Sequence, residues 1–329
     1  MASLTPSNWH VTDGVVTIRP PLPGDANVLV AGRDADFERW LGPGSDAPVP
    51  TACVEHDGAV VGWVDFEIGR EWLDPTEVNV GYHLFSASGG RGHATRAVML
   101  LLHHVALRTD SDTATVLIDP GNVGSLALAE RCGFERRGTV GDQRLLVRPI
   151  PPLTYTAGGR TLRPLGVGDL DRHLDAVDDE QIDWLWEPGQ RALWEAMTEA
   201  QQRDHQRRFL TTTADSFGSG PRWVFAVDTT DDAYVAYVDA ELGNGNGPAG
   251  EANLSYACHP AHRGSGHASA AVRLACDFLR DHTASRRAHL VIDPDNRASL
   301  RVALAVGATA ARSFVDGHGR TLVRHVLDL

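Results

Sequence analysis

The sequence of 329 residues contains no lysine, so all thirty of its basic residues are arginine. Without lysine the chain cannot form a lysine Schiff base, be switched by lysine acetylation or build a Walker-type phosphate loop. Cysteine is scarce too, and the four cysteines form no C-x-x-C pair: Cys53, Cys132, Cys258 and Cys276. The sequence therefore predicts neither a disulfide framework nor a zinc site, and we expect no metal site of another kind.

Long apolar runs are missing as well. None approaches the roughly 18–20 residues that a membrane helix needs, and residues 1–9 lack the features of a signal peptide. We therefore expect a cytoplasmic protein with no membrane partner. Forty-three acidic residues against thirty basic ones give a net charge of −13, which argues against nucleic acid as a partner. The acidic excess weakly favours a cationic amine as substrate.

The chain repeats itself. Thr17–Pro20 recurs as Thr161–Pro164 at an offset of 144 residues, and Val61–Glu67 recurs as Val235–Glu241 at an offset of 174 residues. The larger offset then holds without gaps to the pair Leu126 and Leu300. Chance does not keep one register over some seventy residues, so the sequence predicts two copies of one fold.

The two copies predict two domains, 1–150 and 151–329, joined by the proline-rich stretch 149–152. The change of offset gives the second copy about thirty extra residues, and we expect a helical insertion near 175–215. This insertion contains Trp184, Trp186 and Trp194. It is either a surface helix packed on the domain or a lid over a substrate cleft.

Apolar periodicity predicts the elements of each copy. In the first copy we expect strands at 17–19, 60–68, 78–85, 115–118 and 144–148, and helices at 94–107 and 125–132. The fold class is therefore a mixed α/β (α+β) fold rather than a simple Rossmann alternation.

A glycine loop lies between a strand and a helix in both copies, at 88–95 and at 263–269. Glycines before a helix leave backbone N–H groups free to bind an anion such as a diphosphate, although such loops are often only tight turns. A dinucleotide fingerprint would need glycine at Thr95 or Ser269, so we set that interpretation aside.

A second motif follows the loop. Asn122 and Asn296 each begin Asn-x-x-Ser-Leu, and each lies 29 residues after the loop histidine of its copy. With both motifs, the chain resembles the GNAT N-acetyltransferase superfamily, in particular its RimJ/RimL-type branch, present twice. The family's phosphate-loop pattern (Gln/Arg)-x-x-Gly-x-(Gly/Ala) is met in full by Arg263–Ala268, whereas the first copy has Gly89 in place of the Gln or Arg.

The resemblance implies two GNAT-like domains, each a splayed, mixed, mostly antiparallel sheet flanked by helices. It also implies acetyl-CoA or another acyl-CoA as cofactor, held between the strands at 78–85 and 114–118 and between their counterparts. The cofactor-binding residues that it implies are Leu84, Gly90, Arg91, Gly92, His93, Ala94, Thr95, Asn122 and Ser125 in the first copy, and Cys258, Arg263, Gly264, Ser265, Gly266, His267, Ala268, Ser269 and Asn296 in the second.

The catalytic residues are harder to assign. The tyrosine acid of many relatives is replaced by Ala129 and Ala303, so the resemblance implies Ser125 or Ser299 as proton donor, although a helix-capping serine is an equal alternative. Asn79 and Asn253 replace the glutamate that relatives often place on the strand, and we expect Asn253 in the catalytic site. The remaining candidates for the base are carboxylates of the second copy, Glu241 and Glu251.

The sequence and its resemblance together predict an N-acyltransferase that moves an acyl group, foremost acetyl, to an amine. We expect the second copy to be catalytic, because its loop is complete. The expected partner is a small cationic or amino-sugar metabolite such as an antibiotic, with no nucleic acid, in a monomer or homodimer. A protein N-terminus, a longer acyl chain and a non-catalytic acyl-CoA-binding protein are the alternatives.

Overall fold

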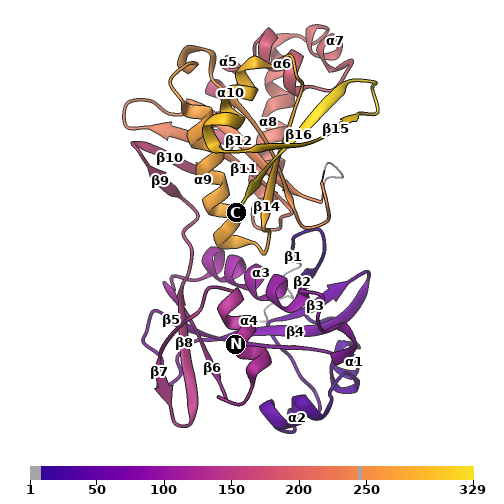
Figure 1. Cartoon of the computed structure of the whole chain (residues 1–329), viewed down its shortest axis with the longest axis vertical. Coiled ribbons are helices and arrows are strands. Elements are labelled where there is room, and N and C mark those ends of the chain that lie inside the picture. Colours follow the sequence, from indigo (N-terminus) through magenta and orange to yellow (C-terminus); the bar gives the residue numbers. More distant parts are fainter. Residues whose placement is uncertain (1–8, 244–246) are drawn as a thin grey trace. The chain divides into compact units, whose positions relative to one another are not determined.

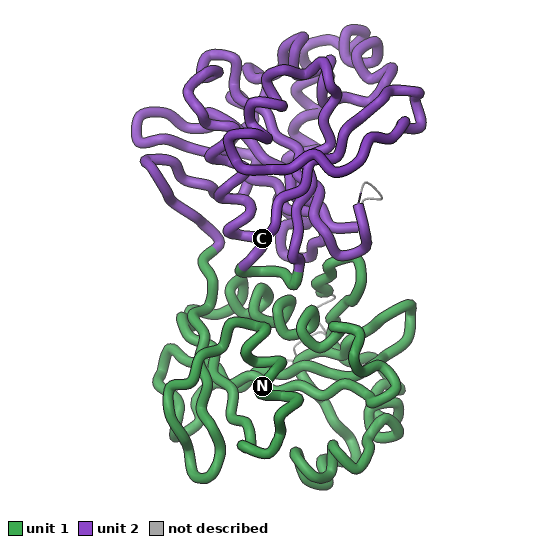
Figure 2. The backbone as a smooth tube through the Cα atoms, in the orientation of Figure 1, with its two compact units in different colours: residues 1–152, 281–284 green, residues 153–280, 285–329 purple. Residues whose placement is uncertain are grey.

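The computed structural model describes residues 9–243 and 247–329. The chain divides into two compact units, residues 1–152 with 281–284 and residues 153–280 with 285–329 (Figure 2). Each unit is built on one eight-stranded sheet. We predicted domains at 1–150 and 151–329, and their independent folding stays a prediction.

The sheet of the first unit has the strand order β1-β2-β3-β4-β5-β6-β8-β7 (Figure 1). Only β5 and β6 run parallel among its paired strands, and the other neighbours are antiparallel. The strands are β1 (Val11–Thr12), β2 (Thr17–Arg19), β3 (Ala52–His56), β4 (Ala59–Glu67), β5 (Glu77–Leu84), β6 (Thr113–Ile118), β7 (Glu135–Val140) and β8 (Gln143–Pro149).

The sheet of the second unit has the order β15-β16-β14-β13-β12-β11-β10-β9 and again contains one parallel pair, β13 with β14. Its strands are β9 (Tyr155–Ala157), β10 (Arg160–Pro164), β11 (Arg222–Thr229), β12 (Ala236–Leu242), β13 (Ala252–Cys258), β14 (Arg287–Ile292), β15 (Thr309–Val315) and β16 (Thr321–Asp328). Helices flank both sheets, which confirms the predicted fold class.

The second half of the chain contains more helices than the first. The helices are α1 (Asp25–Ala31), α2 (Ala35–Leu41), α3 (His93–Arg108) and α4 (Val123–Arg131), then α5 (Leu170–Asp175), α6 (Asp179–Leu185), α7 (Gln190–Glu195), α8 (Glu199–Ser216), α9 (His267–His282) and α10 (Arg297–Val306). The helices predicted at 94–107 and 125–132 are α3 and α4, with ends shifted by one or two residues. Short 3₁₀ turns lie at Ser86–Ser88, Val167–Asp169 and Pro260–His262.

The parallel strands of each sheet separate soon after they meet. β13 pairs with β14 only at Ala252 and Asn253, although it pairs with β12 along its whole length. In the first unit, β5 pairs with β6 only at Glu77–Asn79. The remainder of β13, Leu254–Cys258, therefore presents an unpaired backbone edge toward β14 within the described strands. This arrangement confirms the splayed gap that the resemblance implied.

The inserted structure begins after α6, whereas the sequence predicted an insertion near 175–215. Asp34 and Asp178, which are 144 residues apart, both cap a helix by accepting a hydrogen bond from the N–H three residues on. Trp40 and Trp184 keep the same spacing, so α6 is the counterpart of α2. The first unit then continues through a loop to β3, whereas the second continues into α7 and α8. These two helices are the added structure.

A buried histidine makes the second unit sensitive to acid. The ring of His173 contacts the Tyr234 hydroxyl and, at 3.2 Å, Gln206 Oε1, and burial lowers the pKa of His173 to about 4. The unfolded chain binds a proton near pH 6.5 and the folded chain only near pH 4, so stability falls as the pH falls through this interval.

We expect the protonation of His173 in the unfolded chain to lower the free energy of unfolding by roughly 2 kcal/mol between pH 7 and pH 5. Urea unfolding at both pH values checks this, because His173→Gln cannot titrate and should lose less stability than the original chain. Equal losses in the two proteins would contradict the assignment.

Candidate functional site

The glycine loop of the second unit ends at the first turn of α9. Gly264 has φ +81° and Gly266 has φ +77°, and a Cβ on either would meet no atom within 4 Å. These positions therefore need glycine for their backbone conformation rather than for space. The N–H groups of the first helical turn have no acceptor within the helix, and the helix dipole favours an anion there.

Arg160 of β10 holds this loop in shape. Its Nη2 donates to the carbonyl oxygen of Ser265 at 2.9 Å, and its Nε lies 3.1 Å from His267 Nδ1. Both bonds are made to groups other than the N–H donors of the loop. Arg160 therefore adds positive charge beside the loop without occupying the loop's own donors.

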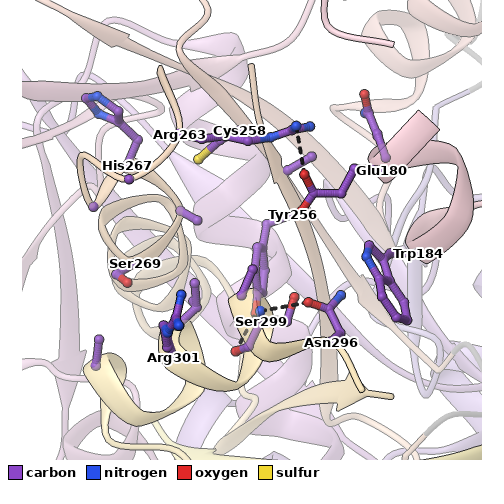
Figure 3. Close-up of a pocket in the computed structure, with 18 of the residues that line it drawn as sticks. Glu180, Trp184, Tyr256, Cys258, Arg263, His267, Ser269, Asn296, Ser299 and Arg301 are labelled. Atoms are coloured by element: carbon purple, nitrogen blue, oxygen red, sulfur yellow. Dashed lines mark hydrogen bonds and ion pairs between the residues drawn. The ribbon is translucent and has the colours of Figure 1, made fainter. Parts of the chain in front are cut away.

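A cavity of about 390 Å³ opens from the loop along the unpaired edge of β13, and we call it the loop cavity (Figure 3). It is walled by α6, the end of β13, the glycine loop and α10. Most residues that the resemblance implied for the second copy line it, namely Cys258, Arg263, Gly264, Gly266, His267, Ala268, Ser269 and Asn296. Ser265 contributes to the loop through its carbonyl oxygen.

Arg263 forms ion pairs where we expected a free phosphate ligand. Its Nη1 lies 2.7 Å from Asp178 Oδ2 and 2.8 Å from Glu180 Oε2, so the loop is tied to the start of α6. Figure 3 shows Arg263 pointing toward Glu180. The Arg263 guanidinium lowers the pKa of the Asp178 carboxyl. An anion in the loop cavity must share this arginine with two carboxylates.

The Asn-x-x-Ser motif forms the start of α10. Asn296 Oδ1 accepts a hydrogen bond from Ser299 N at 2.9 Å, and Asn122 does the same for Ser125 in the first unit. The alternative in which the serine caps the helix is therefore wrong, because the asparagine is the cap. The Ser299 hydroxyl is not needed for capping.

Tyr256 of β13 joins the strand to this helix. Its hydroxyl donates to the carbonyl oxygen of Ser299 at 3.4 Å, as the Tyr82 hydroxyl does to Ser125 at 3.3 Å in the first unit. Burial raises the pKa of Tyr256 to about 12, so the phenol keeps its proton. Figure 3 shows Tyr256 and Ser299 side by side in the middle of the cavity wall.

Two further cavities meet the loop cavity. The hairpin cavity, of about 380 Å³, lies between α6, β13, β14 and the β15–β16 turn. The aromatic cavity, of about 470 Å³, lies between α5–α8 and the strands β11 and β12. Leu185 lines all three, and Tyr256, Asn296 and Ser299 line both the loop cavity and the hairpin cavity. The three spaces therefore converge beside Leu185, and we call this place the junction.

The predicted catalytic residues separate into two pairs. Asn253 and Ser299 line the hairpin cavity. Glu251 instead accepts from His289 Nε2 and lies 4.0 Å from Arg287 Nη1, and Glu241 pairs in register with Asn253 on the neighbouring strand. Neither glutamate lines any of the three cavities. The structure thus brings two of the four to the hairpin cavity.

The first unit has its own cavity, of about 460 Å³, which Leu84, Ala94, Asn122 and Ser125 line. The other residues predicted there form the loop and the start of α3: Gly90, Arg91, Gly92, His93 and Thr95. His83 lines this cavity at the position that Ala257 holds in the second unit, and burial lowers the pKa of His83. The first cavity therefore differs in chemistry, with an imidazole on its strand.

Sequence reasoning missed several residues of the site. Trp184 and Leu185 wall the junction, the Tyr256 hydroxyl contacts the Ser299 carbonyl oxygen, and Arg160 holds the glycine loop. A signal for three of them was present, since Trp-Leu at 40–41 recurs at 184–185 and Tyr82 recurs as Tyr256. Arg160 has no such signal in the sequence.

Two features are absent from the described residues, 9–243 and 247–329. No group of three or more His, Cys, Asp or Glu side chains is placed there to hold a metal ion. None of the helices in these ranges is long and apolar enough to cross a membrane.

Comparison with known proteins identifies the family of both halves of the chain. The model of the acetyltransferase (GNAT) domain family matches residues 16–135 and again 160–309, which is more than half of the chain. No curated protein sequence matches the chain.

Solved structures match one half of the chain at a time. A Vibrio fischeri ribosomal-protein-S5-alanine acetyltransferase is 13% identical with a TM-score of 0.44, covering 53% of this chain and 96% of its own. Mycobacterium smegmatis RimJ in complex with CoA-disulfide is 18% identical with a TM-score of 0.43, covering 51% and 81%. A chimera of the Vibrio cholerae spermidine N-acetyltransferase SpeG and hSSAT is 16% identical with a TM-score of 0.40, covering 52% and 96%.

The partner predicted from the sequence needs correction. We expected a small-molecule amine, no nucleic acid or membrane, and at most a second copy of the chain. The Vibrio fischeri protein carries in its name the ribosomal protein that it acetylates, so a partner restricted to a small amine is wrong.

The two family matches, the two splayed sheets and the two glycine loops lead to one conclusion. The chain belongs to the GNAT acetyltransferase family as two tandem domains, and it is an acyltransferase that uses acyl-CoA.

Proposed function

We propose that the second unit transfers an acetyl group from acetyl-CoA to the α-amine at the N-terminus of a polypeptide. The observation that carries this proposal is the convergence of three cavities at the junction. One cavity suits the acyl donor, and the other two suit an acceptor that branches next to its amine.

The loop cavity fits acyl-CoA in its chemistry. The edge of β13 offers unpaired backbone groups to the amides of the pantetheine, and the loop before α9 offers N–H groups to the diphosphate. Arg160 and Arg301 place positive charge near the loop and on α10. Trp184, Leu185 and Val302 supply apolar walls.

The hairpin cavity fits a protonated amine. Four carboxylates line it, namely Asp183, Glu187, Asp293 and Asp316, together with His318 and Arg320. Asp183, Glu187 and Asp316 pair with Arg191, His318 and Arg320, so among the described residues of this lining Asp293 is the carboxylate left for an ammonium group. Asn253 is only 9% exposed, and its Oδ1 has no hydrogen-bond partner among the described residues. A buried acceptor without a donor is unfavourable, so an amine N–H at Asn253 Oδ1 would satisfy it.

The two cavities that leave the junction suit an acceptor that branches next to its amine. An α-amine is attached to a carbon that carries both a side chain and the next peptide group. At the junction, the hairpin cavity and the aromatic cavity share Leu185 and Ser255, so they extend from one place in two directions. A polypeptide N-terminus uses both directions, whereas an unbranched amine uses one.

Protons must move at two places for this reaction. Bound acetyl-CoA supplies an activated acyl carbon, and the amine must lose a proton before it attacks. Glu251 is engaged by His289, so we assign that proton to water in the polar hairpin cavity. The Ser299 hydroxyl, which lines both the loop cavity and the hairpin cavity, gives a proton to the departing sulfur and regains one from the amine nitrogen, which loses its second proton as the amide forms. Asn253 holds the amine in position.

The test uses the full chain, acetyl-CoA and a thiol-release assay with synthetic heptapeptides that have a free α-amine. We expect turnover that disappears when the same peptides are N-acetylated beforehand, and mass spectrometry should place one acetyl group on the N-terminus. Turnover of simple aliphatic diamines with none of the peptides would overturn the polypeptide acceptor.

A further inference from the structure

The aromatic cavity has a composition unlike that of its neighbours. Trp186, Trp194, Phe209 and Tyr237 line it, with Leu193 at its rim. The rings of Trp186 and Trp194 meet edge to face with centroids 5.3 Å apart. Such walls favour an aromatic or long aliphatic group over a polar one.

The charges in the aromatic cavity cancel. Asp239 forms an ion pair with Arg222, whose guanidinium also lies 5.8 Å from the centre of the Phe209 ring. Burial keeps His173 uncharged at neutral pH, since it lowers its pKa to about 4. A guest with a net charge would therefore find no free counter-ion on these described walls, and an uncharged guest fits them best.

A buried polar atom marks the side of this cavity nearest the acyl donor. Gln181 is 6% exposed, lines both the aromatic cavity and the loop cavity, and its Oε1 has no hydrogen-bond partner among the described residues. The Gln181 side chain also forms a hydrogen bond with Tyr237. A buried oxygen without a partner is unfavourable, and a hydrogen-bond donor on a guest would satisfy it. The first peptide N–H or the α-amine of an acceptor is such a donor.

The aromatic cavity depends on the added helices. Trp194 belongs to α7 and Phe209 to α8, and in the first unit a loop at 42–51 follows α2 in their place. The insertion therefore builds a recognition space beside the junction in the second unit.

We propose that the aromatic cavity binds the side chain of the acceptor's first residue and selects a large uncharged one, aromatic or long aliphatic. This inference rests on the proposed polypeptide acceptor. It assigns acceptor specificity to α7 and α8, and it leaves the chemistry at Ser299 unchanged.

The test compares heptapeptides that differ only at the first residue, with Phe, Leu or Met against Ser, Asp or Lys. We expect kcat/KM to be at least about tenfold higher for the first set, which corresponds to about 1.4 kcal/mol. Calorimetric titration of the acetyl-CoA-free protein should show tighter binding of the Phe peptide than of the Ser peptide, independently of turnover.

Two variants test whether the aromatic cavity causes the preference for a large uncharged first residue. Trp194→Ala removes one aromatic wall of the pocket, so it should abolish the difference in kcat/KM between the Phe and Ser peptides. Leu193→Asp adds a charge at the exposed rim, so it should raise the relative rate of the Lys peptide. Leu304→Asp, the same change at an exposed position on α10, is the control and should alter neither ratio.

The outcomes separate this inference from the proposed function. Equal rates and equal binding for all first residues would overturn the side-chain pocket and leave the polypeptide acceptor intact. A preference that persists in both Trp194→Ala and Leu193→Asp would place specificity elsewhere and overturn it as well. Peptides that neither bind nor react would overturn both.

Discussion

Replacing Ser299 with alanine is expected to lower kcat by about 100-fold, which is the usual contribution of a positioned proton donor. The variant removes only the hydroxyl. The cap of α10 uses the Ser299 N–H, and Tyr256 donates to the Ser299 carbonyl oxygen, so both contacts survive. We therefore expect an unchanged melting temperature and an affinity for CoA within twofold. Stopped-flow detection of thiol release gives kcat, and calorimetry gives the affinity.

The matched change in the first unit identifies the catalytic half. Ser125 has the same cap and the same tyrosine contact as Ser299, so Ser125→Ala perturbs the first unit in an equivalent way. We expect less than a twofold change in kcat. If Ser125→Ala abolishes activity and Ser299→Ala does not, the reaction belongs to the first unit. If neither affects kcat, no serine of this motif is the proton donor.

Much of the fold could be predicted because its sequence pattern occurs twice in the chain. The register between Val61–Glu67 and Val235–Glu241 fixed corresponding strands, and alternation of apolar residues gave β12 its buried face. The loop and the Asn-x-x-Ser motif marked the starts of α3, α4, α9 and α10. These features are local, since a helix start or a strand face depends on residues close in the chain.

The rest of the site depends on contacts between distant segments. A helix as short as α6 has too few turns to show which side is buried, so nothing in its own sequence placed Trp184 in the cavity wall that it shares with Tyr256. The surroundings of the predicted carboxylates depend on such contacts as well. Strand alternation gives the face of a carboxylate and not its partner, and Glu251 is taken by His289.

The two units keep one fold and differ in the residues of their cavities. Both keep a capped serine and a tyrosine contact, which maintain the helix after the splayed strands. The first unit has His83 on the strand and Gly89 in the loop, whereas the second has Ala257 and Arg263. The second also gains α7 and α8. Donor binding and acceptor recognition are thus concentrated in the second unit under our proposal.

Replacing Gly266 with alanine is expected to weaken CoA binding by at least about tenfold. Gly266 has φ +77°, and an L-residue in the left-handed region costs about 1–2 kcal/mol. Space is not the obstacle, because a Cβ there would meet no atom within 4 Å. The loop relieves the strain by rotating its backbone, and this rotation turns the N–H groups before α9 away from the diphosphate.

Calorimetric titration with CoA measures this effect, and two glycine variants make it specific. Gly141→Ala introduces a residue at φ +57° in the turn between β7 and β8, so it carries similar strain and should leave CoA affinity unchanged. Gly92→Ala makes the equivalent change, at φ +79°, in the loop of the first unit. A loss of affinity with Gly92→Ala and none with Gly266→Ala would move donor binding to the first unit, and with it the reaction that we assign to Ser299.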